Sequence, residues 1–239
     1  MRIVTLNTWK NEGDYPRRLE LMAAQLCELR AEVICLQECF AAGAADTATH
    51  LARELAMHAT HRPARCKPRA HQGQTVLSTS GLAVLSRIPP ADADSLELTA
   101  DPRDGERIAL RADLACGLRI LNLHLTHLRD AAALRSTQLA EGLAWARSGW
   151  SGAVMVCGDL NCARADPEFA ALQEAAGEDP GATLHAHRDG DSGRAIDHCV
   201  LVERGGLKVR RRFLALQEAD ARGRFPSDHA AVVIDLDKA

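Results

Sequence analysis

The chain lacks any hydrophobic run long enough to cross a membrane. Its longest apolar stretches have the length of strands, well short of the roughly 20 residues that span a bilayer. The first ten residues, MRIVTLNTWK, contain neither the apolar core of a signal peptide nor a small-residue cleavage site. We therefore expect no signal peptide and no transmembrane segment, and we predict a cytoplasmic protein.

Paired cysteine motifs are also absent, although the chain contains eight cysteines. No two of them form a CxxC pair, which argues against a zinc ribbon or a thioredoxin-like redox site. Several lie inside apolar runs such as VICL and VMVC. We interpret them as reduced thiols that pack as small core residues.

Aromatic residues and excess positive charge are scarce. Aromatics make up 3% of the 239 residues, and the net charge is −3. Few rings are therefore available to stack unpaired bases, and no global positive field attracts a nucleic acid. Both observations favour a small or lipid-like substrate over a tightly bound nucleic acid, although a local basic cleft is compatible with them. The remaining composition is that of an ordinary globular chain, and we expect one domain over residues 1–239.

Short apolar, β-branched runs alternate with segments of helical period, which is typical of an α/β fold. Strands are expected at residues 2–7, 33–38, 82–86, 107–115, 118–125, 153–161, 195–201 and 229–236. Helices are expected in the apolar stripe between the first two strands, at 46–58 and 131–147, and after Asp166-Pro167. This order predicts two packed mixed β-sheets with helices on their outer faces.

Three polar segments show neither pattern, and we predict that they are loops: 62–80, 87–106 and 177–194. The first contains a cluster of cations that includes Arg65 and Lys67. Such a cluster is usually a solvated loop. The functional alternative is a contact with a substrate phosphate near the cleft.

Polar residues gather at the ends of the apolar strands, where α/β enzymes place their sites. They are Asn7, Glu38, His124, Asp159, Asn161, Asp197, Asp228 and His229. The set combines oxygen ligands with imidazoles and lacks a nucleophilic Ser or Cys elbow. Mg²⁺ binds through one or two carboxylates and takes further ligands from water and phosphate. This inventory predicts metal-assisted phosphoester hydrolysis.

Five short motifs resemble the endonuclease/exonuclease/phosphatase superfamily and occur in its order. They are NTW at 7–9, LQE at 36–38, NLHL at 122–125, GDLN at 158–161 and SDH at 227–229. The resemblance extends from residue 3 to residue 235, and GDLN followed by SDH is its most specific part. Arg135 with Gln138, and Ile196 with Asp197, also look like the family pattern.

The resemblance implies a four-layer α/β sandwich with the site at one edge of the two sheets. It also implies a Mg²⁺ cofactor, with Mn²⁺ as an alternative. Glu38 resembles the principal metal ligand, with Asn7 beside it. Asp228 lies in a position to assist a metal or a proton.

For the reacting groups, the resemblance implies that Asp159 orients or deprotonates the attacking water. Asn161 would hold Asp159 or a phosphate oxygen, and His124 would donate to the phosphate or the leaving group. His229 would contact the phosphoryl group and be oriented by Asp197. The choice between Asp159 and His229 as general base stays open, because a nearby cation perturbs both a carboxylate and an imidazole.

Two departures narrow the resemblance. Trp9 stands where some nucleases of the superfamily carry an acidic residue, which argues against a second metal on that side. His124 stands where some DNA-repair members have tyrosine, so the chain looks more like the deoxyribonuclease and sphingomyelinase branches. The substrate stays open among a small molecule, a phospholipid headgroup and a nucleic acid.

Two other functions are compatible with parts of the pattern. One is a non-catalytic phosphate-binding module of the same fold. The other is a zinc hydrolase that uses His124, Asp159 and His229, although Glu38 would then have no role. Among the other histidines, His127 lies beyond its apolar run, and we interpret His185, His187 and His198 as solvated loop or strand-end residues.

Overall fold

Two mixed β-sheets form the centre of the computed structural model, which describes residues 1–185 and 193–239. The larger sheet has the order β11 (Leu207–Ala215), β12 (Ala231–Lys238), β1 (Arg2–Asn7), β2 (Val33–Ala42), β5 (Gln74–Ser86) and β4 (His58–His71), with β3 (Ala45–Asp46) beside β2. The second has the order β10 (Asp197–Glu203), β9 (Ala153–Asp159), β8 (Leu118–His124), β7 (Arg107–Leu114) and β6 (Asp92–Leu98).

Each sheet contains a parallel pair that a helix connects. β1 is parallel to β2 and is linked to it by α1 (Tyr15–Leu29), and β8 is parallel to β9 and is linked to it by α3 (Ala132–Arg147). A parallel connection must return the chain to the same end of the sheet, and a crossover helix does this. The C-terminal ends of these four strands therefore lie at one end of the sandwich.

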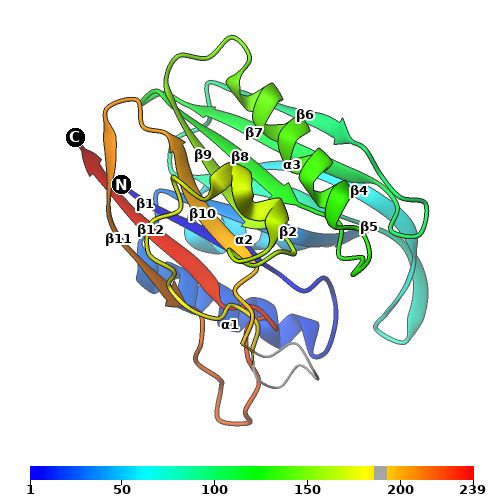
Figure 1. Cartoon of the computed structure of the whole chain (residues 1–239). Helices are drawn as coiled ribbons and strands as arrows, with labels where there is room; N and C mark the ends of the chain where they lie inside the picture. The colour runs from blue at the N-terminus through cyan, green and yellow to red at the C-terminus, as the bar shows by residue number, and fades with distance from the viewer. Residues whose placement is uncertain (186–192) are drawn as a thin grey trace.

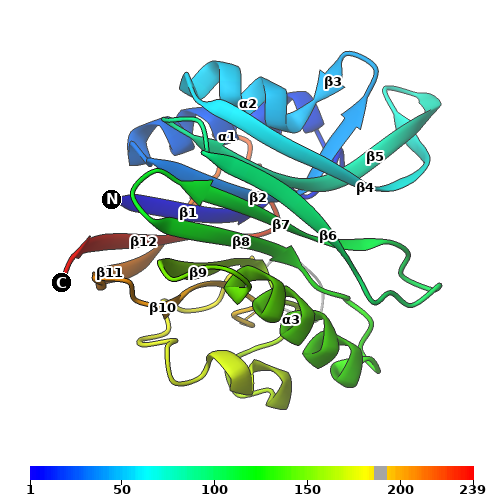
Figure 2. The same ribbon diagram turned by 90° about the horizontal axis from the view of Figure 1, so that it is seen from above.

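Helices cover the outer face of each sheet, so the layers are helix, sheet, sheet, helix (Figures 1 and 2). α1 and α2 (Thr47–Leu55) pack on the larger sheet through side chains such as Met22 and Leu51. α3 and the 3₁₀ helix η1 (Pro167–Leu172) pack on the second sheet through Leu139 and Phe169. The predicted four-layer sandwich is confirmed.

Successive residues of the central strands point alternately into two different cores. In β1, Ile3 enters the core between the sheets while Val4 and Leu6 enter the core under the helices. In β9, Met155 points between the sheets while Val156 points toward α3. Because both faces are buried, these strands appear in the sequence as continuous apolar runs.

The segments predicted as loops contain three of the strands. Residues 62–80 form most of the β4–β5 hairpin, and residues 87–106 include β6. β11 was not expected as a strand either. β4, β6 and β11 are all edge strands, and edge strands tolerate the polar residues and prolines that hid them in the sequence.

Two further segments bear on the predictions. In the third predicted loop, the described residues 177–185 and 193–194 contain an isolated bridge between Leu184 and His229, and His187 lies outside the described residues. Asp166 does not cap the helix that follows it; its carboxylate accepts from the backbone N–H of Ala163, and that helix is a short 3₁₀ turn.

In the described residues, no helix is long and apolar enough to cross a membrane.

All eight cysteines are free thiols. Five are buried in the cores, as expected: Cys35, Cys39, Cys157, Cys162 and Cys199. The other three, Cys27, Cys66 and Cys116, are exposed, so the core interpretation was wrong for them.

Candidate active site

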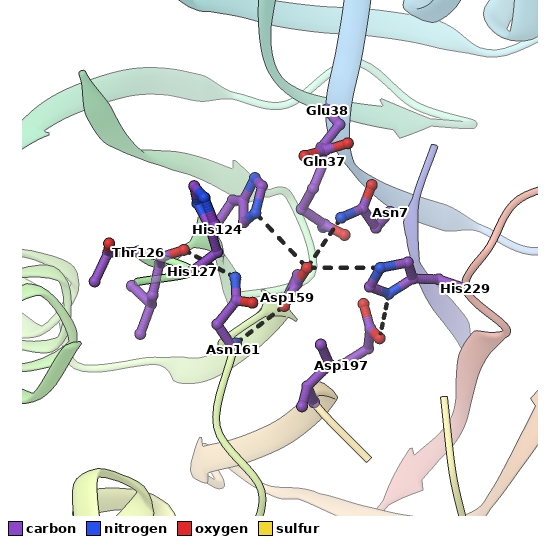
Figure 3. A network of polar contacts seen from close by, with 12 residues as sticks. Asn7, Gln37, Glu38, His124, Thr126, His127, Asp159, Asn161, Asp197 and His229 are labelled. Carbon is purple, nitrogen blue, oxygen red and sulfur yellow. Dashed lines mark hydrogen bonds and ion pairs between the residues drawn. The ribbon is translucent and has the colours of Figure 1, made fainter. Parts of the chain in front are cut away.

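The predicted polar residues converge at one end of the sandwich, around a cavity of about 310 Å³. The period-two alternation that sends Ile3 and Met155 between the sheets also sends Asn7 and Asp159 there. The cavity is lined by Asn7, Glu38, His124, Asp159, Asn161, Asp228 and His229. Asp197 lies behind His229 and is buried. Residues from distant parts of the sequence thus form one cluster, and Figure 3 labels all of them except Asp228.

Asp159 is at the centre of the cluster, where Asn7, His124, Asn161 and His229 contact it (Figure 3). Its Oδ2 accepts a hydrogen bond from Asn7 Nδ2 at 2.9 Å, and its Oδ1 accepts one from the backbone N–H of Asn161 at 2.9 Å. His124 Nε2 and His229 Nε2 lie 3.6 and 4.0 Å from Oδ2. The carboxylate is therefore fixed from several sides while one edge faces the cavity.

The glycine of GDLN is required by the backbone that carries Asp159. Gly158 has φ +144°, and a Cβ there would lie 1.9 Å from the carbonyl oxygen of Leu123 on β8. Any side chain would push β8 and β9 apart at the point where His124 and Asp159 are paired.

His229 and Asp197 form a buried pair. His229 Nδ1 lies 2.7 Å from Asp197 Oδ2, and both side chains are almost fully enclosed. Burial lowers the pKa of His229, but Asp197, Asp159 and Asp228 together raise it to about 10. His229 is therefore an imidazolium at neutral pH, with Nδ1–H donated to Asp197 and Nε2 lying 3.8 Å from Asp228 Oδ1 and 4.0 Å from Asp159 Oδ2.

The other groups titrate in different directions because their surroundings differ. Burial, followed by the charge of Asp197, raises the pKa of Asp159 to about 6. Burial and the neighbouring cations, Arg107 first, lower the pKa of His124 well below its usual value, so this imidazole is neutral. Burial raises the pKa of Glu38, but Lys10 outweighs it and the net pKa is lowered.

Glu38 reaches the cavity because β2 is irregular at this point. The pairing of β2 with β5 shifts register between Leu36 and Cys39, and Glu38 has φ +56°. Such a bulge turns a side chain away from the alternation of the strand. Its carboxylate Oε1 lies 2.6 Å from Lys10 Nζ.

A buried amide pair supports this bulge: Gln37 lies on β2 itself and Asn122 lies on β8 of the opposite sheet. Gln37 Nε2 donates to Asn122 Oδ1 at 2.7 Å, and Asn122 Nδ2 donates to the carbonyls of Leu36 and Ala83. Both side chains belong to the family-like motifs but were not predicted as site residues. The signal that could have identified them in the sequence is a polar residue on the inward face of an apolar strand.

The remaining predicted residues lie in short loops beside Asp159. Asn161 has φ +51°, and its Nδ2 donates to the carbonyl of Leu125. Ser227 Oγ donates to the carbonyl of Asn7, which fixes the start of the segment that carries Asp228 and His229. Asp228 Oδ1 lies 3.8 Å from His229 Nε2.

A further buried carboxylate, Asp104, was not predicted from the sequence and supports His124 through Arg107. Asp104 accepts two hydrogen bonds from Arg107 and lies 2.9 Å from His127 Nδ1 and 3.2 Å from Arg65 Nη1. Arg107 also donates to the carbonyl of His124. His127 thus belongs to this outer group, whereas His124 Nε2 lies 3.6 Å from Asp159 Oδ2.

Arg135 and Gln138 of α3 have a structural position. Arg135 pairs with Glu168 and donates to the carbonyl of Leu128, while Gln138 accepts from the backbone N–H of Thr126. They hold the loop that follows His124. His198 lies at the start of β10, as the strand-end interpretation expected, but it is buried rather than solvated, and its Nε2 lies 2.9 Å from the carbonyl oxygen of Cys162.

The donor atoms at this site fit a divalent cation. Asp159, Asp197 and His229 offer ligand atoms within 4.8 Å of one another, and Asp197 Oδ1 has no hydrogen-bond partner in the described part of the chain. Glu38, Asn7 and Asp228 offer further oxygen atoms to the same cavity. A set dominated by carboxylate and amide oxygens suits a hard cation such as Mg²⁺ or Mn²⁺.

The chain matches the model of the endonuclease/exonuclease/phosphatase family over residues 4–229. It therefore belongs to this family. A search of curated proteins found no significant relative.

Solved structures share the fold over the whole chain. The catalytic domain of human Nocturnin with a bound sulfate is 19% identical, with a TM-score of 0.75 and coverage of 100% of this chain and 94% of that one. TDP2 of D. rerio in complex with a single-stranded DNA product is 14% identical, with a TM-score of 0.74 and coverage of 100% and 99%. A protein of unknown function from Enterococcus faecalis is 18% identical, with a TM-score of 0.72 and full coverage of both chains.

Proposed function

We propose that this protein is a divalent-metal-dependent phosphoester hydrolase that cleaves a phosphodiester, or a phosphomonoester, by in-line attack of an activated water. The observation that carries the proposal is the position of Asp159. Its carboxylate faces the cavity between two imidazoles in opposite protonation states, with the carboxylate of Glu38 on the same cavity wall. This arrangement supplies a base, two phosphate contacts and a metal ligand.

The electrostatics favour Asp159 as the group that orients and deprotonates the water. With a pKa raised to about 6, it is ionised at neutral pH and more basic than an ordinary aspartate. His229 is already protonated, so it is suited to stabilise negative charge on the phosphoryl oxygens rather than to accept a proton. Asp197 keeps that charge in place.

The neutral imidazole of His124 supports a different role. Its Nε2 lies 3.6 Å from Asp159 Oδ2, on the side of the cavity opposite to His229. Here it is suited to donate a hydrogen bond to a phosphoryl oxygen or to the leaving group. Asn161 orients Asp159 through its backbone N–H.

We assign the metal to Glu38 and Asn7, with assistance from Asp228. When bound there, Mg²⁺ or Mn²⁺ would neutralise charge on the phosphate and polarise it for attack. The cluster of Asp159, Asp197 and His229 is less suitable, because a metal on His229 Nδ1 would replace the hydrogen bond to Asp197 and meet a protonated ring. The same argument disfavours a zinc site.

Only likeness of fold supports a substrate class, and the class that we propose is a phosphoester. Among the similar structures, human Nocturnin holds a bound sulfate and D. rerio TDP2 holds a single-stranded DNA product, so both of those proteins bind anions on a comparable fold. Lys10, Arg65 and Arg107 line the present cavity and offer positive charge to a phosphate.

The decisive test measures hydrolysis of a chromogenic phosphodiester and its monoester by chelator-stripped protein, with Mg²⁺, Mn²⁺ or Zn²⁺ added back. We expect turnover with Mg²⁺ or Mn²⁺ that falls by about 10³-fold or more in Asp159→Asn, with the melting temperature unchanged. Turnover that Zn²⁺ restores best would favour a zinc enzyme. No turnover and no Mg²⁺ binding in the folded protein would favour the non-catalytic phosphate-binding module.

A further inference from the structure

The loop after β1 carries a lysine into the cavity in an unusual backbone conformation. Trp9 and Lys10 both have positive φ, 55° and 42°. Two consecutive non-glycine residues in the left-handed region are unfavourable and persist only where the surroundings fix them.

Arg18 of α1 supplies this constraint. Its guanidinium is buried and donates hydrogen bonds to the carbonyls of Thr8, Trp9, Lys10, Glu12 and Pro226. It also lies 4.7 Å from the centre of the Trp9 ring. The position of Lys10 is thus built into the fold and does not depend on a freely moving loop.

The constrained loop places the ammonium of Lys10 on a predicted metal ligand. Lys10 Nζ lies 2.6 Å from Glu38 Oε1, and the side chains are 28% and 13% exposed. Lys10 lines the same cavity as His124 and His229. In this partly enclosed site, a lysine and a divalent cation on one carboxylate would repel each other strongly.

We propose that Lys10 and the divalent metal compete for Glu38, and that a phosphate in the cavity relieves this competition by taking the ammonium of Lys10. This inference rests on the proposed function and specifies how its site is assembled. Metal and phosphate would then bind with positive coupling that passes through Lys10. Because such coupling is reciprocal, each ligand raises the affinity for the other by the same factor.

The first experiment measures Mn²⁺ affinity by calorimetry, without phosphate, in the chelator-stripped full-length protein and in variants. We expect Lys10→Met and Lys10→Gln to bind Mn²⁺ about tenfold more tightly, within the usual range of coupling between sites. Lys10→Arg, which keeps the charge, should bind as weakly as the wild type. Lys67→Met is the matched control, since Lys67 is an exposed cation of the β4–β5 hairpin that does not line the cavity.

The second experiment repeats the Mn²⁺ titration in the presence of inorganic phosphate. The gain in affinity on adding phosphate should be larger in the wild type than in the two neutral variants. Equal Mn²⁺ affinity in the wild type, Lys10→Met and Lys10→Gln would overturn the inference and leave the proposed function standing. Absence of Mn²⁺ binding in all of these proteins, folded by circular dichroism, would overturn both.

Discussion

At the scale of single residues, the surroundings of each titratable group set its pKa, and the groups of the site therefore differ in protonation state. Asp197 has His229 as its direct partner, whereas Asp159 has a neutral amide, a backbone N–H and two more distant imidazoles. Burial, followed by the charge of Asp197, raises the pKa of Asp159, and the charges of Asp197 and Asp159 raise the pKa of His229 against the effect of burial. Pairs of titratable groups whose surroundings shift their pKa values apart are typical of acid–base sites.

Replacement of Asp197 by asparagine tests this arrangement. An amide in place of the carboxylate removes the charge that keeps His229 protonated and allows the wrong tautomer. We expect kcat to fall by about 10² to 10⁴-fold, with a much smaller change in KM, because the oriented His229 acts mainly in the transition state. Steady-state kinetics with the chromogenic phosphoester measure this.

The matched control for that variant is Asp94→Asn, at an exposed aspartate of β6. It should leave kcat unchanged. A kcat for Asp197→Asn within twofold of the wild type would contradict the role of Asp197 as the residue that positions His229.

At the scale of elements, the strands that the sequence did not reveal, β4, β6 and β11, lie at the edges of the sheets and have one partner each. The central strands are buried on both faces, and their apolar runs were recognised from residue types alone. β4, β6 and β11 lie at sheet edges and carry polar residues, prolines or arginines. Their strand conformation comes from hydrogen bonding to a neighbour, which no local pattern encodes.

The junction of β8 and β9 gives a prediction at this scale. In Gly158→Ala, the new Cβ would meet the Leu123 carbonyl at 1.9 Å, so the two strands must separate or the backbone must rotate. We expect the free energy of unfolding to fall by about 3 kcal/mol or more, which is at the high end for one substitution. Urea denaturation followed by circular dichroism measures it.

Gly43→Ala is the comparison, because Gly43 also has a positive φ, +57°, but a Cβ there meets no atom within 4 Å. In this variant, the free energy of unfolding should fall only by the cost of placing alanine in the left-handed backbone conformation, about 1 kcal/mol. Equal losses for the two variants would show that close strand contact at Gly158 has no additional effect.

At the scale of the whole molecule, one tyrosine reports on the packing of the helical layer. Tyr15 is the only tyrosine in the sequence, is buried against Phe40, and lies 2.9 Å from Thr47 Oγ1, which joins α1 to α2. Burial, only partly offset by the bond to Thr47, raises its pKa from 10.0 to about 12.

This shift predicts a loss of stability at alkaline pH. A raised folded-state pKa stabilises the fold fully below the unfolded pKa, and that stabilisation is lost as pH rises from about 10 to about 12. The amount is about 3 kcal/mol, from two pKa units. Tyrosinate absorbance, read against unfolding by circular dichroism, measures it.

Tyr15→Phe should remove this pH dependence. It loses the hydroxyl that titrates but keeps the ring that packs against Phe40. A tyrosine that titrates near pH 10 while the chain is still folded would contradict the burial of the hydroxyl.

The sequence by itself determined the layered α/β fold and the strand ends at which the site is built. Apolar runs buried on both faces and a helical stripe between them are local patterns, and short motifs such as GDLN and SDH mark the strand ends. Only the tertiary structure decided that Lys10 forms an ion pair with Glu38 and that the basic segment is a β-hairpin. It also decided that Asp104 pairs with Arg65, Arg107 and His127. These contacts join segments distant in the chain, and their energies depend on burial and distance, which a linear pattern does not contain.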